Sequence, residues 1–203
     1  MLSSQGFDLW ADGYDASVGL SDEENSYPFA GYKQVLGTIY RAIRMQAGCG
    51  CVLDLGFGTG TLAHRLYQDG YEITGVDFSP RMIQLAQEKM PDAHLLCCDF
   101  SQGLPEKLGR FDAIVSTYAL HHLTDAEKPV FLRGLLRHLK PGGKIYIGDV
   151  AFESREALEE CRRQSGGEWD DEEFYFAADE LEEMLGYKVS FEKCSFCAGV
   201  ITL

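Results

Sequence analysis

No run of apolar residues in this sequence approaches the roughly 18 that a membrane-spanning helix needs. The first stretch, MLSSQGFDLWADGYD, has neither the basic segment nor the apolar core of a secretory signal peptide. These two absences predict a cytoplasmic protein.

Basic residues are scarce, with 18 Lys and Arg against 32 Asp and Glu and a net charge of −14. Proteins that bind nucleic acids neutralise phosphates with Lys and Arg, so DNA, RNA and anionic membranes are not expected partners. A neutral or cationic small molecule suits this charge better. Solubility alone explains the acidity equally well.

The seven cysteines give no support for a disulfide framework or a metal centre. Their number is odd and the chain is not small. The pairs CGC and CSFC lack further ligands at the spacing that zinc sites use. We expect reduced, mostly buried thiols and no metal.

Strand-like and helix-like segments alternate between residues 50 and 152. Apolar strands are predicted at 51–55, 71–77, 93–99, 111–119 and 144–152, with amphipathic helices between them. This alternation predicts one doubly wound domain with a parallel sheet covered on both faces. Helical pieces are predicted within residues 1–46, and a helix and an antiparallel strand pair within 179–203.

Local signals mark the helix boundaries. Ser79 followed by Pro80 is typical of a helix start. Thr124 and Glu127 form a capping-box pattern that opens a helix reaching His138.

Three glycines, Gly56, Gly58 and Gly60, follow the first strand in VLDLGFGTG. Ligands of doubly wound sheets bind at the carboxyl ends of the strands, where this turn is predicted. The dinucleotide fingerprint G-x-G-x-x-G would place its third glycine at Thr61, and the Gly-Lys-Ser/Thr ending of a P-loop is absent.

The string DLGFGTG resembles the first motif of the class I S-adenosylmethionine (SAM)-dependent methyltransferases. Four further stretches resemble later motifs of this family in the right order over residues 50–147: GVDFSPRMI, LLCCDF, STYALHHL and LKPGGKIYI. The whole chain is similar to small bacterial methyltransferases of the YrrT-like group. The resemblance implies an α/β, doubly wound, Rossmann-like sheet of seven mostly parallel strands with an antiparallel last strand, plus N-terminal lid helices.

The resemblance also implies a division of the single domain. Residues 1–46 would form the lid, 50–152 the SAM-binding core, 153–178 a substrate-cap insert, and 179–203 the closing helix and strands. The insert carries Trp169, Phe174, Tyr175 and Phe176, which either line the acceptor pocket or pack a short helix.

Cofactor contacts follow from the same resemblance. The glycine turn would wrap the methionine part of SAM, Asp54 would hold its ammonium group, and Asp77 would accept from the ribose hydroxyls. Adenine would contact Phe78, Met82, Asp99 and Phe100. Each Asp is also a common turn or cap residue, and core packing explains Phe78 and Met82 nearly as well.

Two residues are candidates for catalysis, His121 and Tyr14. The methyl group of SAM is electrophilic, so transfer relies mainly on proximity and orientation, and a base is needed only for a protonated acceptor. For His121, a base and a histidine that only shapes the loop are equal interpretations, and His122 beside it is not expected to share its face. Tyr14 either closes on the methyl donor as a lid aromatic or packs with Trp10 on a helix.

The sequence therefore favours a SAM-dependent methyltransferase that acts on a small-molecule acceptor and releases S-adenosylhomocysteine. The Asn/Asp-Pro-Pro-Tyr/Phe motif of amino methyltransferases acting on adenine or glutamine is replaced by residues 116–119, STYA. Two alternatives remain: a non-catalytic SAM-binding protein or subunit, and an NAD(P)-dependent oxidoreductase. A monomer or homodimer is expected.

Overall fold

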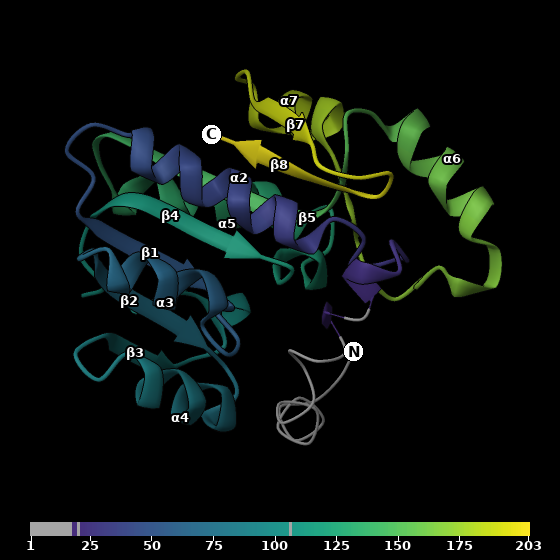
Figure 1. Cartoon of the computed structure of the whole chain (residues 1–203). Coiled ribbons are helices and arrows are strands. Elements are labelled where there is room, and N and C mark those ends of the chain that lie inside the picture. The colour runs from purple at the N-terminus through teal and green to yellow at the C-terminus, as the bar shows by residue number, and fades with distance from the viewer. Residues whose placement is uncertain (1–17, 20, 106) are drawn as a thin grey trace.

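The computed structural model describes residues 18–19, 21–105 and 107–203. Its centre is an eight-stranded sheet in the order β3-β2-β1-β4-β5-β8-β7, with β6 pairing beside β5 (Figure 1). The strands are β1 (Cys51–Leu55), β2 (Glu72–Asp77), β3 (His94–Cys97), β4 (Phe111–Thr117), β5 (Leu139–Phe152), β6 (Phe176–Ala177), β7 (Ser190–Lys193) and β8 (Ala198–Thr202).

Strands β3, β2, β1, β4 and β5 are parallel, whereas the last strand, β8, runs antiparallel to both of its neighbours. This confirms the predicted doubly wound sheet with an antiparallel last strand. The order of strands reverses at β1, so the carboxyl ends of β1 and β4 are where a ligand site is expected.

Helices cover both faces of the sheet. The helices are α2 (Tyr32–Met45), α3 (Thr61–Gln68), α4 (Pro80–Lys89), α5 (Glu127–Leu135), α6 (Arg155–Ser165) and α7 (Ala178–Leu185). One apolar cluster joins the sheet to α2 and α3, and a second joins it to α5 and α7. Helix α2 lies close against β5 because Gly148 has no side chain: a Cβ there would lie 2.3 Å from Val35 Cγ1.

The local signals formed the predicted caps. The Ser79 hydroxyl accepts from the Met82 N–H at 3.1 Å, with Pro80 in the first turn of α4. Thr124 and Glu127 bond reciprocally, through Thr124 N–H to Glu127 Oε2 at 2.9 Å and Glu127 N–H to Thr124 Oγ1 at 3.3 Å. Helix α5 itself ends at Leu135, and the turn η3 (Leu136–His138) continues it to the predicted end.

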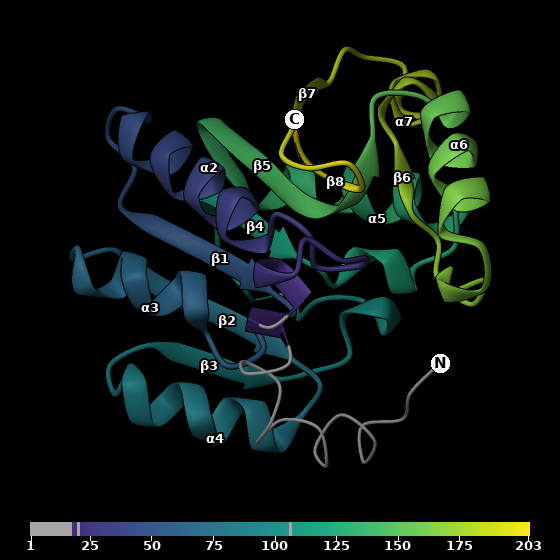
Figure 2. The same ribbon diagram turned by 45° about the vertical axis from the view of Figure 1, so that its right-hand side comes forward.

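Two parts of the chain lie beyond the carboxyl ends of the strands. Figures 1 and 2 place the segment that precedes α2, drawn in purple, on the side to which the arrowheads of β1 and β4 point. The short turn η4 (Gly166–Glu168) follows α6, and the chain then returns to β6 beside β5. Ring contacts between Tyr27 and Trp169 join these two parts.

The cysteines depart from expectation in one respect. All seven are free thiols, but only Cys161, Cys194 and Cys197 are buried. Cys97 is exposed because it ends β3, which has a neighbouring strand on one side only. Among the described residues, no helix is long and apolar enough to cross a membrane.

Candidate functional site

The turn between β1 and α3 needs glycine at three positions. Gly56, Gly58 and Gly60 have φ values of +69°, +56° and +78°, a region that side chains disfavour. A Cβ on Gly56 would lie 2.4 Å from Ala119 Cβ, and one on Gly60 would lie 2.9 Å from Met90 Cε. At Gly58 nothing lies within 4 Å. Two of these glycines therefore permit close packing, and Gly58 alone faces open space.

Two acidic side chains lie at the ends of neighbouring strands beside this turn. Asp77 Oδ2 accepts from the Gly58 N–H and Asp77 Oδ1 from the Ser79 N–H, both at 2.9 Å. Asp54 is buried, and its Oδ1 has no hydrogen-bond partner among the described residues. Burial, and next the charge of Asp77, raise the pKa of Asp54 to about 7. A ligand cation or hydrogen-bond donor would relieve this buried acidic pair.

The residues predicted to contact adenine differ in their exposure. Met82 is buried and its side chain belongs to the inner face of α4, as the packing interpretation required. Phe100 is buried and contacts Phe131, with ring centroids 5.5 Å apart. Phe78 is partly exposed, and Asp99 is exposed with its Oδ1 accepting from the Ser101 N–H at 3.0 Å. Phe78 and Asp99 are thus the members of the set that reach the surface.

His121 lies between two carboxylates. It belongs to the turn η2 (Leu120–His122), directly after β4, and is buried. Its Nδ1 is 2.7 Å from Asp149 Oδ1 on β5, and its Nε2 is 3.4 Å from Glu173 Oε1. Burial acts to lower the pKa of His121, but the charge and hydrogen bond of Asp149, with the charge of Glu173, outweigh burial and raise it.

The neighbouring His122 contradicts the expectation that the two histidines lie on different faces. Their ring centroids are only 4.3 Å apart, because a 3₁₀ turn rather than a strand carries them. Burial, and next the charge of His121, lower the pKa of His122 to about 4. Donor atoms of His121, His122 and Glu173 lie within 4.8 Å of one another, a separation that could admit a metal ion.

Tyr118 precedes this turn in an unusual conformation. Its φ is +50°, which is rare for a residue with a side chain and is found most often at functional sites. Its hydroxyl group is buried without a hydrogen-bond partner among the described residues, and so is Asp149 Oδ2. Burial, and next the charge of Asp149, raise the pKa of Tyr118 well above its ordinary value.

An aromatic cluster of Tyr27, Trp169 and Tyr175 lies next to His121. Tyr27 stacks on Trp169 at 5.4 Å, and Tyr175 meets Trp169 edge-on at 4.9 Å and His121 at 6.1 Å between ring centroids. The Tyr27 and Tyr175 hydroxyl groups share a hydrogen bond, and Tyr175 donates to Glu173 Oε2 at 2.7 Å. The two tyrosine hydroxyls are thus linked through Glu173 to His121. Asp149 on β5 contacts the opposite side of the His121 ring.

Tyr27 and Glu173 belong to this site although the sequence alone does not indicate either of them. Glu173 is one of several acidic residues in the stretch EWDDEEF, and nothing in that pattern singles it out. Tyr27 precedes Pro28, a position that indicates a turn but no contact 148 residues away. The other candidate for catalysis, Tyr14, lies outside the described residues.

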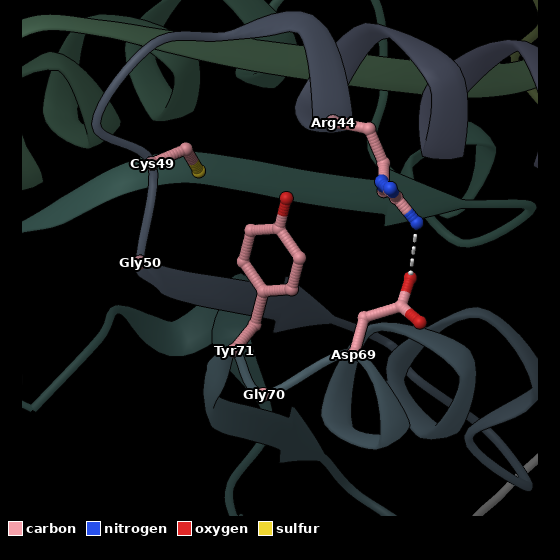
Figure 3. Close-up of a pocket in the computed structure, with 6 residues that line it drawn as sticks. All are labelled: Arg44, Cys49, Gly50, Asp69, Gly70 and Tyr71. Atoms are coloured by element: carbon pink, nitrogen blue, oxygen red, sulfur yellow. Dashed lines mark hydrogen bonds and ion pairs between the residues drawn. The ribbon is translucent and has the colours of Figure 1, made fainter.

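A hollow lies at the opposite edge of the sheet, where the strands begin. Its volume is about 530 Å³, and it is lined by Arg44, Cys49, Gly50, Asp69, Gly70 and Tyr71. Figure 3 shows the Tyr71 ring between Cys49 and the Arg44–Asp69 ion pair, whose charged atoms are 3.1 Å apart. None of the predicted site residues lines this hollow. The candidate site therefore remains the one at the carboxyl ends of the parallel strands.

Comparisons with known proteins agree with this placement. A family model described as a methyltransferase domain matches residues 52–143. This range includes the glycine turn and the ends of β1 and β2, where Asp54 and Asp77 lie. An uncharacterized methyltransferase of Geobacillus kaustophilus is 38% identical over 196 residues, covering 91% of this chain and 88% of the relative. The chain belongs to the methyltransferase family of these relatives.

A second relative and two solved structures are also similar to this chain. A methyltransferase of Geobacillus sp. strain WCH70 is 39% identical over 197 residues, covering 91% of this chain and 89% of the relative. A DhpI complex with S-adenosylhomocysteine has a TM-score of 0.69 at 20% identity, with 98% of this chain and 93% of that chain covered. DesVI of Streptomyces venezuelae has a TM-score of 0.68 at 17% identity, covering 95% and 96%. At these identities the structures show the shared fold.

Proposed function

We propose that this methyltransferase transfers the methyl group of SAM to a small-molecule acceptor held beside His121. The observation that carries the proposal is the contact between Gly56 and Ala119. It brings the glycine turn, where a donor would lie, against the loop that leads two residues later to His121. The methyl donor and the acceptor beside His121 would therefore lie at the ends of adjacent strands, close enough for in-line transfer.

The residues around the turn fit SAM. The open space at Gly58 admits a ligand next to the backbone, and the unpartnered Asp54 Oδ1 offers an acceptor for an ammonium group. The Asp77 carboxylate, fixed by two backbone N–H groups, would accept hydrogen bonds from ribose hydroxyls, since each carboxylate oxygen has two lone pairs. Phe78 and Asp99 would reach the adenine, with Met82 and Phe100 packed behind them.

When bound, SAM supplies an electrophilic methyl group on a sulfonium centre. The chain must then position the acceptor, exclude water and, for a protonated acceptor, remove a proton. His121 suits the last task because Asp149 fixes its ring through Nδ1 and leaves Nε2 directed away from β5 toward Glu173. Tyr14 stays a proposal for a lid aromatic.

Calorimetric titration with SAM, S-adenosylhomocysteine and NAD tests this proposal. We expect saturable binding of the first two, no binding of NAD, and loss of binding in Asp54→Asn and Asp77→Ala. Asp92→Ala is the matched control, because Asp92 is exposed and accepts from the Tyr67 hydroxyl at 2.9 Å, away from the glycine turn. A folded sample that binds NAD, or that binds neither SAM nor its product, contradicts the proposal.

A specific observation separates catalysis from mere ligand binding. A SAM-binding subunit would need the glycine turn and Asp77 but has no use for a buried His121–Asp149 pair behind it. Release of S-adenosylhomocysteine from a panel of small acceptors, abolished in His121→Ala with SAM affinity intact, would favour the enzyme over the binding protein.

A further inference from the structure

The site at His121 is built to hold positive charge. Both ring nitrogens face carboxylate oxygens, those of Asp149 at 2.7 Å and of Glu173 at 3.4 Å. Nδ1 is hydrogen-bonded to Asp149, and Nε2 lies within ion-pair distance of Glu173, so both carboxylates favour a ring that carries two protons. The raised pKa of His121, in spite of its burial, agrees with this geometry.

The other charged or titratable groups near the His121 ring do not cancel the negative charge of Asp149 and Glu173. His122, on the same turn, is held neutral by its lowered pKa. Lys128 on α5 is the nearby cation, but its ammonium group is already bonded to Asp125 Oδ1 at 2.9 Å and to the carbonyl oxygens of Phe174 and Tyr175. Its charge acts to lower the pKa of His121, but the two carboxylates outweigh it and the pKa stays raised.

Unused hydrogen-bonding capacity lies at the same place. Asp149 is completely buried, yet its Oδ2 has no partner among the residues the structure describes. The buried Tyr118 hydroxyl is in the same state, on a ring that packs against Phe29 and Tyr32, and the charge of Asp149 acts on it. Leaving buried polar atoms unpaired is costly, so a ligand that carries N–H donors would be stabilised here.

Aromatic rings form the remaining boundary. Tyr175 bonds directly to Glu173 and meets Trp169 edge-on, and Tyr27 stacks on Trp169. Electron-rich ring faces beside a carboxylate are the usual surroundings of a bound organic cation. A net charge of −14 would also draw a cation toward the protein.

We propose that the methyl acceptor is a small primary or secondary amine that binds as an ammonium ion between Glu173 and the His121–Asp149 pair. This inference rests on the proposed methyltransferase function and names its substrate class. The arriving cation replaces the charge that His121 carries at rest, so His121 releases its proton to solvent and becomes the neutral base.

The reaction then balances as follows for a primary amine. Neutral His121 takes one proton from the ammonium ion through Nε2 and leaves the nitrogen lone pair free. The acceptor nitrogen forms a C–N bond to the methyl carbon as the C–S bond breaks, and that electron pair stays on sulfur. The products are a methylated ammonium ion, S-adenosylhomocysteine and one proton held by His121, which passes to solvent.

Matched acceptors test the inference. Butylamine, butan-1-ol and butanoate share a carbon chain, as do phenethylamine, 2-phenylethanol and 3-phenylpropanoate, and larger primary and secondary amines extend the panel. The readout is S-adenosylhomocysteine release together with the mass of the methylated product, and SAM binding is measured in the same samples. We expect methylated amines and no methylated alcohols or acids.

Variants locate the recognition. Glu173→Gln removes one negative charge and should raise the KM for the amine about tenfold or more while the Kd for SAM stays unchanged. Glu172→Gln, an exposed neighbour on the same segment, is the matched control and should leave both constants unchanged. A KM unaffected by Glu173→Gln would overturn the inference.

The two proposals fail in different ways. If SAM binds but no amine in the panel is methylated, or if alcohols or acids react instead, the amine inference is wrong and the methyltransferase proposal stands. If SAM does not bind to the folded protein, the proposed function is the part that has failed.

Discussion

The Nδ1 atom of His121 lies 2.7 Å from Oδ1 of Asp149, and this contact ties the turn after β4 to the end of β5. The two residues are 28 positions apart in the chain and meet because β4 and β5 are adjacent parallel strands. Both residues are buried, so the contact is isolated from solvent. It fixes the orientation of the ring and, once the ring is neutral, keeps the remaining proton on Nδ1, which leaves Nε2 free for the proposed chemistry.

Replacing Asp149 with Asn should lower the pKa of His121 below 6.5. Burial would then act without the carboxylate that opposes it. NMR titration of the histidine ring signals in folded protein measures this directly, with Glu172→Gln as the control. A His121 pKa that stays raised in Asp149→Asn would show that Glu173 alone holds the proton.

The same contact predicts how stability depends on pH. A His whose pKa is raised by folding contributes stability that is fully present below its unfolded pKa of about 6.5 and is lost as pH rises through the folded value. Urea unfolding of His121→Asn and wild type should therefore show a larger difference at pH 5.5 than at pH 9. Equal differences at both pH values would contradict a protonated His121.

Asp54→Asn should stabilise the ligand-free protein at alkaline pH and weaken SAM binding. Folding raises the pKa of this buried carboxyl from 3.8 to about 7, so its contribution to stability is present below pH 3.8 and is lost as pH rises through about 7. The cost of ionising it in the folded state is roughly 4 kcal/mol. Urea unfolding at pH 8.5 should show the Asp54→Asn variant more stable than wild type by up to that amount, with little difference at pH 4. A less stable variant at pH 8.5 would mean that the ionised carboxylate has a partner in the free protein.

Gly56→Ala and Gly58→Ala should separate folding from binding. A Cβ on Gly56 meets Ala119 at 2.4 Å, so Gly56→Ala should destabilise the fold by more than the roughly 1–2 kcal/mol expected for a positive φ alone. Gly58→Ala meets no atom and should cost only about that strain, yet it should weaken SAM binding because its methyl group occupies ligand space. Unfolding curves and SAM titrations check both, and unchanged SAM affinity in Gly58→Ala would place the ligand elsewhere.

Chelation should leave the protein unchanged. Both nitrogens of His121 are already engaged by carboxylates, which argues for a proton rather than a metal ion between His121 and Glu173. Dialysis against EDTA should therefore alter neither SAM affinity nor acceptor methylation. Stoichiometric zinc or manganese found by elemental analysis, with activity lost on its removal, would assign His121, His122 and Glu173 to a metal site instead.

Features encoded by neighbours in sequence were predictable, and those that depend on distant partners were not. The caps at Ser79 and Thr124 and the strand at 51–55 rest on local geometry and periodicity, and the structure has them as predicted. The glycine turn is recognisable from the sequence, but the close approach of Gly56 to Ala119 depends on a residue that follows another strand. The pairing of His121 with Glu173 depends on the path of the chain after α6, about which residue type and spacing say nothing.

The hydrogen bond between the Tyr27 and Tyr175 hydroxyl groups has a consequence for chimeric proteins, in which segments are swapped between family members. It makes the segment before α2 and the segment before β6 a single wall built from two distant stretches of chain. A chimera that receives only residues 153–178 of another family member would face a mismatched counterpart at Tyr27. Acceptor preference should therefore transfer only when both stretches are swapped together.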